Sequence, residues 1–183
     1  MKFLDRFLRD WRIKKCLPYI PNGSRVLDIG CFDESLLEKL TAKNIKDSIG
    51  IDPLLDSFSE KASYSLIPGQ FPSAIPEGMV FDCITMLAVL EHMPKNVQET
   101  LSDRCHQLLA DKGRVIITVP SPKVDDILAF LKKLNLIEGM SLEEHYGFKT
   151  EDVPHIFKTN QFRLLRHQKF QLALNNLYVF EKK

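Results

Sequence analysis

The sequence predicts an α/β fold, a three-layer sandwich in which helices cover both faces of a mostly parallel sheet. Short apolar runs alternate with helical patterns along the chain, and a strand at 25–29 passes through a single glycine, Gly30, directly into a helix. The run at 81–87 is almost continuously apolar, as in parallel strands buried on both faces. At 183 residues, 44% of them hydrophobic, we expect one domain spanning 1–183.

The opening segment, residues 1–20, predicts a helix with an apolar stripe opposite a basic face. The stripe consists of Phe3, Leu4, Phe7, Leu8 and Trp11. Two interpretations stay open: the helix packs on the domain or closes over a ligand, or it makes a weak contact with a membrane surface or a lipid. Pro18 and Pro21 end the helix before the first strand.

The remaining elements follow in alternation. Helices are predicted at 33–43, 94–109, 123–134 and from Thr150 to about Lys158, where Thr150 is the expected cap. Further strands are predicted at 48–51, 64–67, 81–87, 114–119, 162–170 and 172–180. The less regular stretch at 135–149 is expected to be a lid or insertion on the substrate side.

Asp52 follows Gly30 by 22 positions and ends the next apolar strand. A glycine turn followed by an acid at about this spacing is typical of a nucleoside site, where the carboxylate accepts hydrogen bonds from ribose hydroxyls. The loop lacks the further glycines of a dinucleotide-binding turn and carries Asp33 and Glu34 instead. Together with Asp28, these acids favour a ligand that has no phosphates and has a cationic amino-acid end.

Four motifs occur in order: VLDIGC (26–31), GIDP (50–53), FDCITMLAVLEHMP (81–94) and GRVIITVPSP (113–122). They resemble the successive motifs of class I S-adenosylmethionine-dependent methyltransferases, in the small-molecule branch with VLEH after the fourth strand. The resemblance implies a Rossmann-like, seven-stranded sheet ordered 3-2-1-4-5-7-6 with an antiparallel edge strand. It also implies S-adenosyl-L-methionine as cofactor and an EC 2.1.1 activity.

The resemblance implies a set of cofactor-binding residues at the carboxyl edge of the sheet. Asp52 is expected at the ribose, while Gln70 and Phe71 are expected at the adenine, with an ordinary turn as the alternative for this pair. The family has glycine where this chain has Phe32, and a side chain there is costly if the backbone angle φ is positive. The full set is Asp28, Gly30, Cys31, Phe32, Asp52, Pro53, Gln70, Phe71, Met86, Leu87 and His92.

Two histidines are candidate catalytic residues, because an imidazole can accept a proton at neutral pH. His92 follows the fourth expected strand of the parallel sheet and either contacts the ligand as a base or orients a neighbour by a hydrogen bond. His145 lies within an acidic and aromatic cluster, and three alternatives stay open for it: it faces solvent, it contacts the substrate, or it holds a metal. We expect no metal site overall.

The formal net charge of +1 gives no reason to expect a polyanionic partner. The tetrapeptide typical of adenine and glutamine amino-methyltransferases is replaced at 86–89, so we expect no nucleic-acid partner and a small-molecule acceptor. Four cysteines without a paired spacing indicate reduced thiols and a cytoplasmic location. The alternatives are a fold of this family that has lost catalysis and serves as a binding or scaffold protein, and a short Rossmann reductase.

Overall fold

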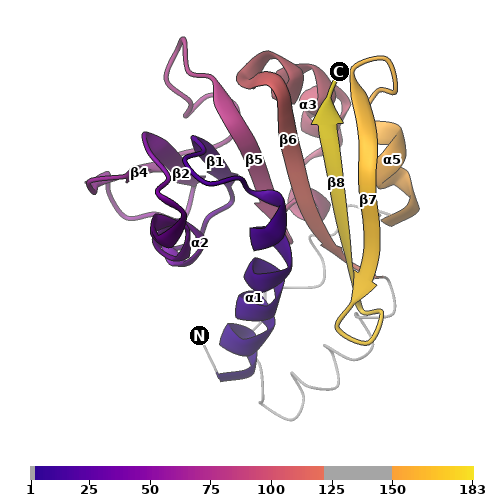
Figure 1. The fold of residues 1–183 in the computed structure, drawn as a ribbon, viewed down its shortest axis with the longest axis horizontal. Helices are drawn as coiled ribbons and strands as arrows, with labels where there is room; N and C mark the ends of the chain where they lie inside the picture. Colours follow the sequence, from indigo (N-terminus) through magenta and orange to yellow (C-terminus); the bar gives the residue numbers. More distant parts are fainter. Residues whose placement is uncertain (1–2, 122–149) are drawn as a thin grey trace.

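The computed structural model describes residues 3–121 and 150–183, which form one eight-stranded sheet flanked by helices (Figure 1). The order of the strands across the sheet is β3-β4-β2-β1-β5-β6-β8-β7. In chain order the strands are β1 (Val26–Ile29), β2 (Ser48–Asp52), β3 (Ser59–Glu60), β4 (Tyr64–Pro68), β5 (Phe81–Leu87), β6 (Leu109–Pro120), β7 (Phe162–Phe170) and β8 (Asn175–Lys182).

This topology confirms the predicted order 3-2-1-4-5-7-6, to which the two-residue strand β3 is added at one edge. Neighbours from β4 through β2, β1 and β5 to β6 pair in parallel. β8 lies antiparallel between β6 and the edge strand β7, and β3 is antiparallel to β4 at the opposite edge. The next strands, β2 and β4, lie on one side of β1, and β5 and β6 lie on the other. The carboxyl end of β1 is therefore a topological switch point, the usual place for a ligand in an open α/β sheet.

Helices cover the two faces of the sheet and produce two separate cores (Figure 1). The helices α1 (Phe3–Cys16) and α2 (Ser35–Leu40) lie on one face, and α3 (Lys95–Leu108) and α5 (Val153–Ile156) lie on the other. Side chains alternate along β1, so that Val26 packs into the α1/α2 core while Leu27 and Ile29 pack into the α3/α5 core. Asp28 shares the side of Val26 and therefore lies on the α1 face.

The helix after Thr150 is shorter than expected. A 3₁₀ turn, η5 (Thr150–Asp152), leads into the four-residue α5. The hydroxyl of Thr150 donates to the carbonyl of Pro120 at 3.0 Å, so the side chain ties this segment to β6 instead of capping a helix.

The last strand, β8, begins at Asn175 and not at 172. Gln171, Leu172 and Ala173 adopt positive φ angles of 51°, 55° and 65° and form the turn between β7 and β8. The predicted helix at 123–134 and the predicted lid at 135–149 lie outside the described residues.

The apolar stripe predicted for the opening helix is only partly the docking face of α1. Phe3 and Phe7 are 77% and 50% exposed, whereas the buried residues of α1 are Ile13 and Cys16. Both buried residues belong to the core that contains the leucines of α2. The helix therefore packs mainly through its carboxyl-terminal half, and its first two turns extend beyond the core.

Candidate functional site

The glycine turn after β1 forms the centre of the site. Gly30 has a φ angle of +71°, and a Cβ atom added at this position would lie 2.4 Å from a methyl carbon of Val89. The amides of Gly30 and Cys31 donate to the carbonyl of Ile51 at 2.8 and 3.2 Å, which joins the turn to β2. Close approach by the 88–89 segment and the left-handed backbone both require glycine here.

Phe32 adopts a left-handed backbone conformation in the same turn. Its φ angle is +54°, in the region that favours glycine, and its side chain is 53% exposed. The ring of Phe32 points towards solvent, so the turn accommodates a side chain at this position. Cys31, next to it, is buried, and Gly50 on β2 makes room for it, since a Cβ there would lie 2.9 Å from the Cys31 sulfur.

Asp52, at the end of β2, lies beside this turn and is 7% exposed. One carboxylate oxygen accepts from the amide of Phe32 at 2.9 Å, and the other accepts from the amide of Leu54 at 2.8 Å. A carboxylate offers about four acceptor sites, so Asp52 can accept further hydrogen bonds from a ligand. Pro53, the next residue, is exposed.

Asp28 is the most deeply buried of the acids around the glycine turn, at 4% exposed. The hydroxyl of Thr85 on β5 donates to its carboxylate at 2.6 Å. Burial raises the pKa of Asp28 to about 7, a rise that the Thr85 hydrogen bond opposes and that the negative charges of Asp33 and Asp52 reinforce. A cationic group placed against this acid would be favoured, because it would relieve the cost of the buried negative charge.

Asp33 and Glu34, expected to face a cationic ligand, already have partners within the chain. Arg9 on α1 donates to Asp33 at 2.6 Å. The hydroxyl of Tyr64 donates to Glu34 at 2.9 Å, and the Lys61 ammonium lies 3.7 Å from the same carboxylate. Residues distant in sequence therefore already contact these two acids, and their role toward a cationic ligand stays a prediction. Asp28 is the more deeply buried acid and is better suited to a cationic group.

The residues expected at the adenine lie after β4. Gln70 is exposed, and its carbonyl accepts from the amide of Ala74 at 2.9 Å. Phe71 is partly buried against the α3/α5 core. At the end of β5, Met86 is fully buried in the same core, whereas Leu87 is partly buried and packs against the α1/α2 core.

The structure describes one of the two candidate bases. His92 lies in the 3₁₀ turn η3 (Leu90–His92), directly after β5 at the carboxyl edge, and is partly buried. Its amide donates to the carbonyl of Val89 at 3.0 Å. His145 lies outside the described residues, so its role stays a prediction.

Arg9 and Arg12 of α1 are functional candidates that the sequence analysis did not single out. In the structure they lie on the inner side of α1, near the buried residues Ile13 and Cys16. The spacing of Arg9, Ile13 and Cys16, four and then three positions apart, marks one helix face, and this is the signal that would have identified the side that packs.

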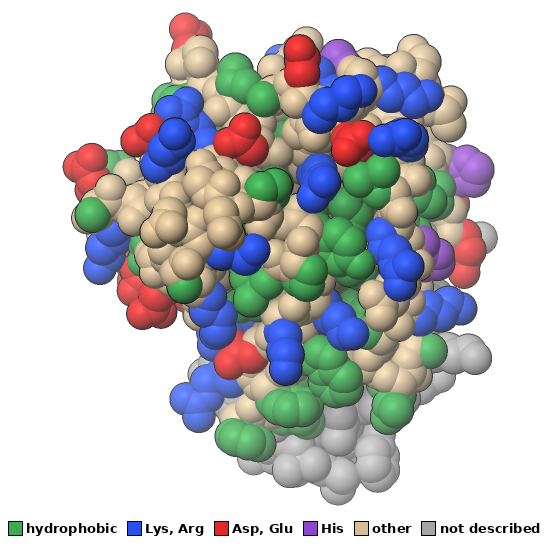
Figure 2. Space-filling model, in the orientation of Figure 1, with side chains coloured by type: hydrophobic (Ala, Val, Ile, Leu, Met, Phe, Trp, Pro, Cys, Tyr) green, Lys and Arg blue, Asp and Glu red, His purple; other side chains and the backbone are tan. Residues whose placement is uncertain are grey.

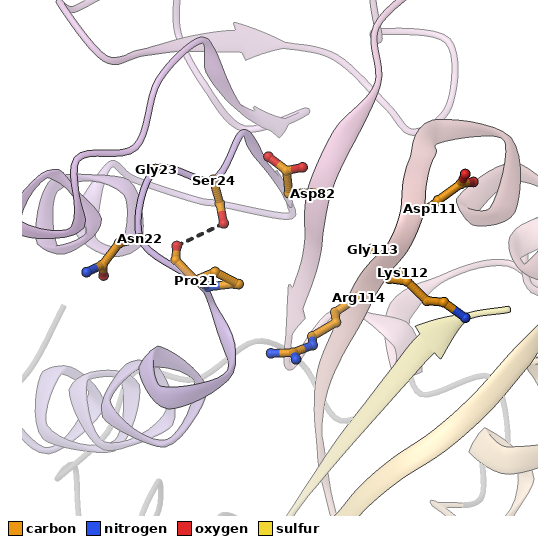
Figure 3. Close-up of a pocket in the computed structure, with 9 residues that line it drawn as sticks. All are labelled: Pro21, Asn22, Gly23, Ser24, Asp82, Asp111, Lys112, Gly113 and Arg114. Atoms are coloured by element: carbon orange, nitrogen blue, oxygen red, sulfur yellow. Dashed lines mark hydrogen bonds between the residues drawn. The ribbon is translucent and has the colours of Figure 1, made fainter.

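A hollow of about 340 Å³ lies at the opposite, amino-terminal end of the sheet (Figure 3). Two of its charged side chains are engaged in the fold: Asp82 accepts from the amide of Arg25 at 2.8 Å, and Arg114 donates to the carbonyl of Tyr19 at 3.0 Å. The lining includes no residue of the glycine turn, so the hollow is separate from it. It is lined by Pro21, Asn22, Gly23, Ser24, Asp82, Asp111, Lys112, Gly113 and Arg114.

All four cysteines are free and buried, and burial raises the pKa of each thiol: Cys16, Cys31, Cys83 and Cys105. Such thiols are poor nucleophiles.

Across 3–121 and 150–183, no group of three or more His, Cys, Asp or Glu side chains is arranged to hold a metal ion. Within those same ranges, none of the helices has the length and apolar character needed to cross a bilayer.

Comparison with known proteins relates this geometry to a family. Residues 2–172 match the model of a family described as a methyltransferase domain. No curated protein matches the chain.

Solved structures share the fold at low sequence identity. The N-methyltransferase NodS from Bradyrhizobium japonicum WM9 is 15% identical, with a TM-score of 0.64 over 97% of this chain and 96% of NodS. Magnesium protoporphyrin IX methyltransferase (ChlM) from Synechocystis PCC 6803, solved with bound SAH, is 18% identical. Its TM-score is 0.65, and the match covers 98% of this chain and 84% of ChlM. The pyocyanin biosynthetic protein PhzM is 14% identical, with a TM-score of 0.65 over 94% of this chain, which spans only 54% of PhzM.

Proposed function

Because the chain belongs to the methyltransferase-domain family, we propose that it transfers a methyl group from S-adenosylmethionine to a small-molecule acceptor. The observation that carries the proposal is the junction of Gly30 and Asp52. A tight glycine turn and a buried acid meet at the topological switch point, joined by the 2.9 Å hydrogen bond from Phe32 to Asp52. This arrangement suits the ribose and amino-acid parts of a nucleoside ligand better than a diphosphate.

The described residues fit this cofactor. The cradle at Gly30 is closed to any side chain, and the remaining acceptor capacity of Asp52 suits ribose hydroxyls. Asp28, a buried acid with a raised pKa, would hold the ammonium of the amino-acid end. The turn residues Cys31 and Phe32, the edge residues Pro53, Met86 and Leu87, and the adenine pair Gln70 and Phe71 complete the proposed contact set.

The cofactor would supply an electrophilic methyl carbon, and the protein's task is then to place the acceptor in line with it. Correct positioning alone can lower a barrier by about 7 to 11 kcal/mol. For a hydroxyl or protonated amine acceptor, His92 would hold the departing proton on its imidazole. For a neutral nucleophile His92 would only orient the acceptor.

We further propose a cytoplasmic location, a single domain over 1–183 and a weak lipid contact through the start of α1. Four buried free thiols suit a reducing compartment.

The lipid contact is suggested by exposed apolar side chains: Phe3, Phe7 and Leu172 are 77%, 50% and 92% exposed. Figure 2 shows hydrophobic side chains together with Lys and Arg on the face of the molecule that carries α1. Sedimentation with vesicles of anionic lipid, and not with neutral vesicles, is expected for the wild-type protein and is expected to weaken in Phe3→Ser/Phe7→Ser.

Calorimetric titration with S-adenosylmethionine and, separately, with S-adenosylhomocysteine tests the main proposal. We expect micromolar binding of both ligands, followed by methyl transfer once an acceptor is supplied. If neither ligand bound, the proposal would be wrong, and a fold that has lost its cofactor would be favoured. Tight NADH binding without a response to S-adenosylmethionine would indicate a reductase instead.

A further inference from the structure

Two buried amide side chains connect the sheet to α1 through a short run of hydrogen bonds. Gln171, in the β7–β8 turn, donates from Nε2 to the backbone carbonyl of Leu8 at 2.9 Å. Its Oε1 accepts from Nδ2 of Asn175, the first residue of β8, at 2.8 Å. Gln171 and Asn175 are 6% and 5% exposed, so neither amide relies on solvent for its hydrogen bonds.

The backbone carbonyl at one end sets the direction of both hydrogen bonds. A carbonyl only accepts, so Gln171 directs its amino group to Leu8 and its side-chain oxygen to Asn175. Asn175 then directs its own amino group to Gln171, which leaves its oxygen, Oδ1, at the far end of the run. This oxygen is buried and accepts no hydrogen bond from any residue that the structure describes. The group that would complete the run is therefore a hydrogen-bond donor.

Thr118 on β6 carries a second buried oxygen without a partner. The residue is 0% exposed, and within 3–121 and 150–183 its Oγ1 atom forms no hydrogen bond. Thr118 lies opposite Leu177, two residues after Asn175, so Thr118 and Asn175 are diagonal neighbours across the β6–β8 pair. Leu177, and Phe170 opposite Asn175 on β7, belong to the α1/α2 core, which places both unpartnered side chains on that face of the sheet. Diagonal positions are about 7 to 8 Å apart, so one ligand group can reach both oxygens.

The strand register relates this pair to the proposed cofactor site. Thr118 lies opposite Leu87 on β5, and its carbonyl accepts from the amide of Ala88 at 2.8 Å. The next residue, Val89, packs against Gly30. β8 runs antiparallel to β6, so Asn175, its first residue, lies at the same edge of the sheet as the end of β6. The two oxygens are therefore at the edge that carries the glycine turn, with β5 between them and β1.

We propose that Thr118 and Asn175 bind a hydrogen-bond donor on the methyl acceptor, which is a hydroxyl group or an amide or amine N–H. Asn175 Oδ1 accepts from this group, and the Thr118 hydroxyl completes its hydrogen bonding. The inference rests on the proposed function and narrows its substrate class. The acceptor carries a polar donor group, which an acyl chain or an isolated carboxylate does not have.

The same pair indicates how the ligand would enter. Both oxygens are shielded from solvent, and the run of hydrogen bonds that begins at Asn175 ends on α1 at Leu8. Displacement of the start of α1 would break this run and uncover the pair. A buried polar atom without a hydrogen bond destabilises the free protein, and the donor of the ligand would remove that cost.

Melting temperatures test whether the Thr118 hydroxyl has a partner in the free protein. Thr118→Val keeps the shape of the side chain and removes the hydroxyl, so it is expected to melt no lower than wild type. Thr85→Val is the matched control, because the Thr85 hydroxyl is equally buried on the neighbouring strand but donates to Asp28 at 2.6 Å. Loss of that hydrogen bond is expected to lower the Tm by about 3 to 12 °C.

Two small probes of nearly the same shape test the requirement for a donor. Acetamide donates and accepts, whereas acetone only accepts, and each is titrated into protein saturated with S-adenosylhomocysteine while the backbone amide NMR signals of 117–119 and 174–177 are followed. We expect acetamide to bind wild type with a dissociation constant on the order of 10 mM and acetone to bind at least fivefold more weakly. Thr118→Val is expected to weaken acetamide binding at least fivefold, and Thr100→Val, which removes an exposed hydroxyl of α3, is expected to leave it unchanged.

Three results would overturn the inference. If Thr118→Val melted as far below wild type as Thr85→Val, its hydroxyl would support the fold and not a ligand. Equal affinities for acetamide and acetone, or no acetamide binding by wild type, would remove the donor site. Acetamide binding unchanged in Thr118→Val would remove Thr118 from it. Failure of wild type to bind S-adenosylhomocysteine would instead refute the proposed function, and the melting comparison uses no ligand and is independent of it.

Discussion

Phe32 carries strain at the centre of the site. Its φ angle of +54° costs a residue with a side chain roughly 1 to 2 kcal/mol, and its ring, at 53% exposed, recovers little of this by burial. We expect Phe32→Gly to be more stable than Phe32→Ala by about 1 kcal/mol, since only glycine relieves the strain. Urea denaturation of the two variants measures the difference directly.

The alanine variant is the control, because both substitutions remove the same ring and differ only in the Cβ atom. Equal urea midpoints for Phe32→Gly and Phe32→Ala would mean that the left-handed conformation carries no cost. The comparison also tests the turn's function, because a glycine that preserves S-adenosylhomocysteine binding would show that the ring is not needed for it.

Asp52 supports the turn and is the proposed ribose partner. A hydrogen bond to a charged group contributes about 1.5 to 3 kcal/mol, so Asp52→Ala should weaken S-adenosylmethionine binding by about 10- to 150-fold. Part of this loss reflects the amides of Phe32 and Leu54, which also depend on the carboxylate. Asp56→Ala, an exposed acid in the following loop, is the matched control in calorimetry. An unchanged dissociation constant for Asp52→Ala would exclude the ribose role.

At the scale of elements, α1 is fastened across the cofactor side of the molecule. Arg9 pairs with Asp33 in the glycine turn, and the side chain of Gln171 donates to the carbonyl of Leu8 at 2.9 Å from the β7–β8 turn. The Arg9 and Asp33 side chains are 23% and 35% exposed, so solvent screens the pair and its contribution is about 1 kcal/mol or less. The pair therefore matters more for local opening than for global stability.

Arg9→Met should accordingly leave the Tm within a few degrees of wild type while increasing hydrogen exchange at 3–16 and 31–35. Arg6→Met, which removes the same charge from an exposed position of α1, is expected to leave exchange in both segments unchanged. The same increase in both variants would attribute the effect to helix charge and not to the Arg9–Asp33 contact.

The elements differ in how far the sequence could predict them. The strand ending at Ile29 and the one ending at Asp52 were predictable because parallel strands are apolar throughout and their carboxyl ends meet at one edge. The docking face of α1 was not predictable, because the apolar stripe at 3–11 has more large apolar residues than the face formed by Ile13 and Cys16. The Arg9–Asp33 contact joins residues 24 positions apart, and no local period encodes it.

At the scale of the whole molecule, the topology concentrates negative charge at the switch point. Asp28 ends up buried between α1 and the sheet, with Asp33 and Asp52 close enough to raise its pKa further. Three acids from separate segments converge because β1, β2 and the start of α2 all reach the same edge. The fold thus carries an electrostatic cost that a cationic ligand would relieve, which links stability to the site.

This cost makes stability depend on pH. Burial raises the pKa of Asp28 from 3.8 to about 7, so between these values the native state holds a proton that the unfolded chain has released. The contribution of this proton to the free energy of unfolding is fully present below pH 3.8 and is lost as the pH rises through 7. Its maximum is roughly 4 kcal/mol. Asp28→Asn keeps an oxygen for the Thr85 hydroxyl and has no charge, so its stability relative to wild type should increase from pH 5 to pH 8. Urea midpoints over this range measure the difference, with Asp56→Asn as control, and parallel curves for Asp28→Asn and wild type would contradict the raised pKa.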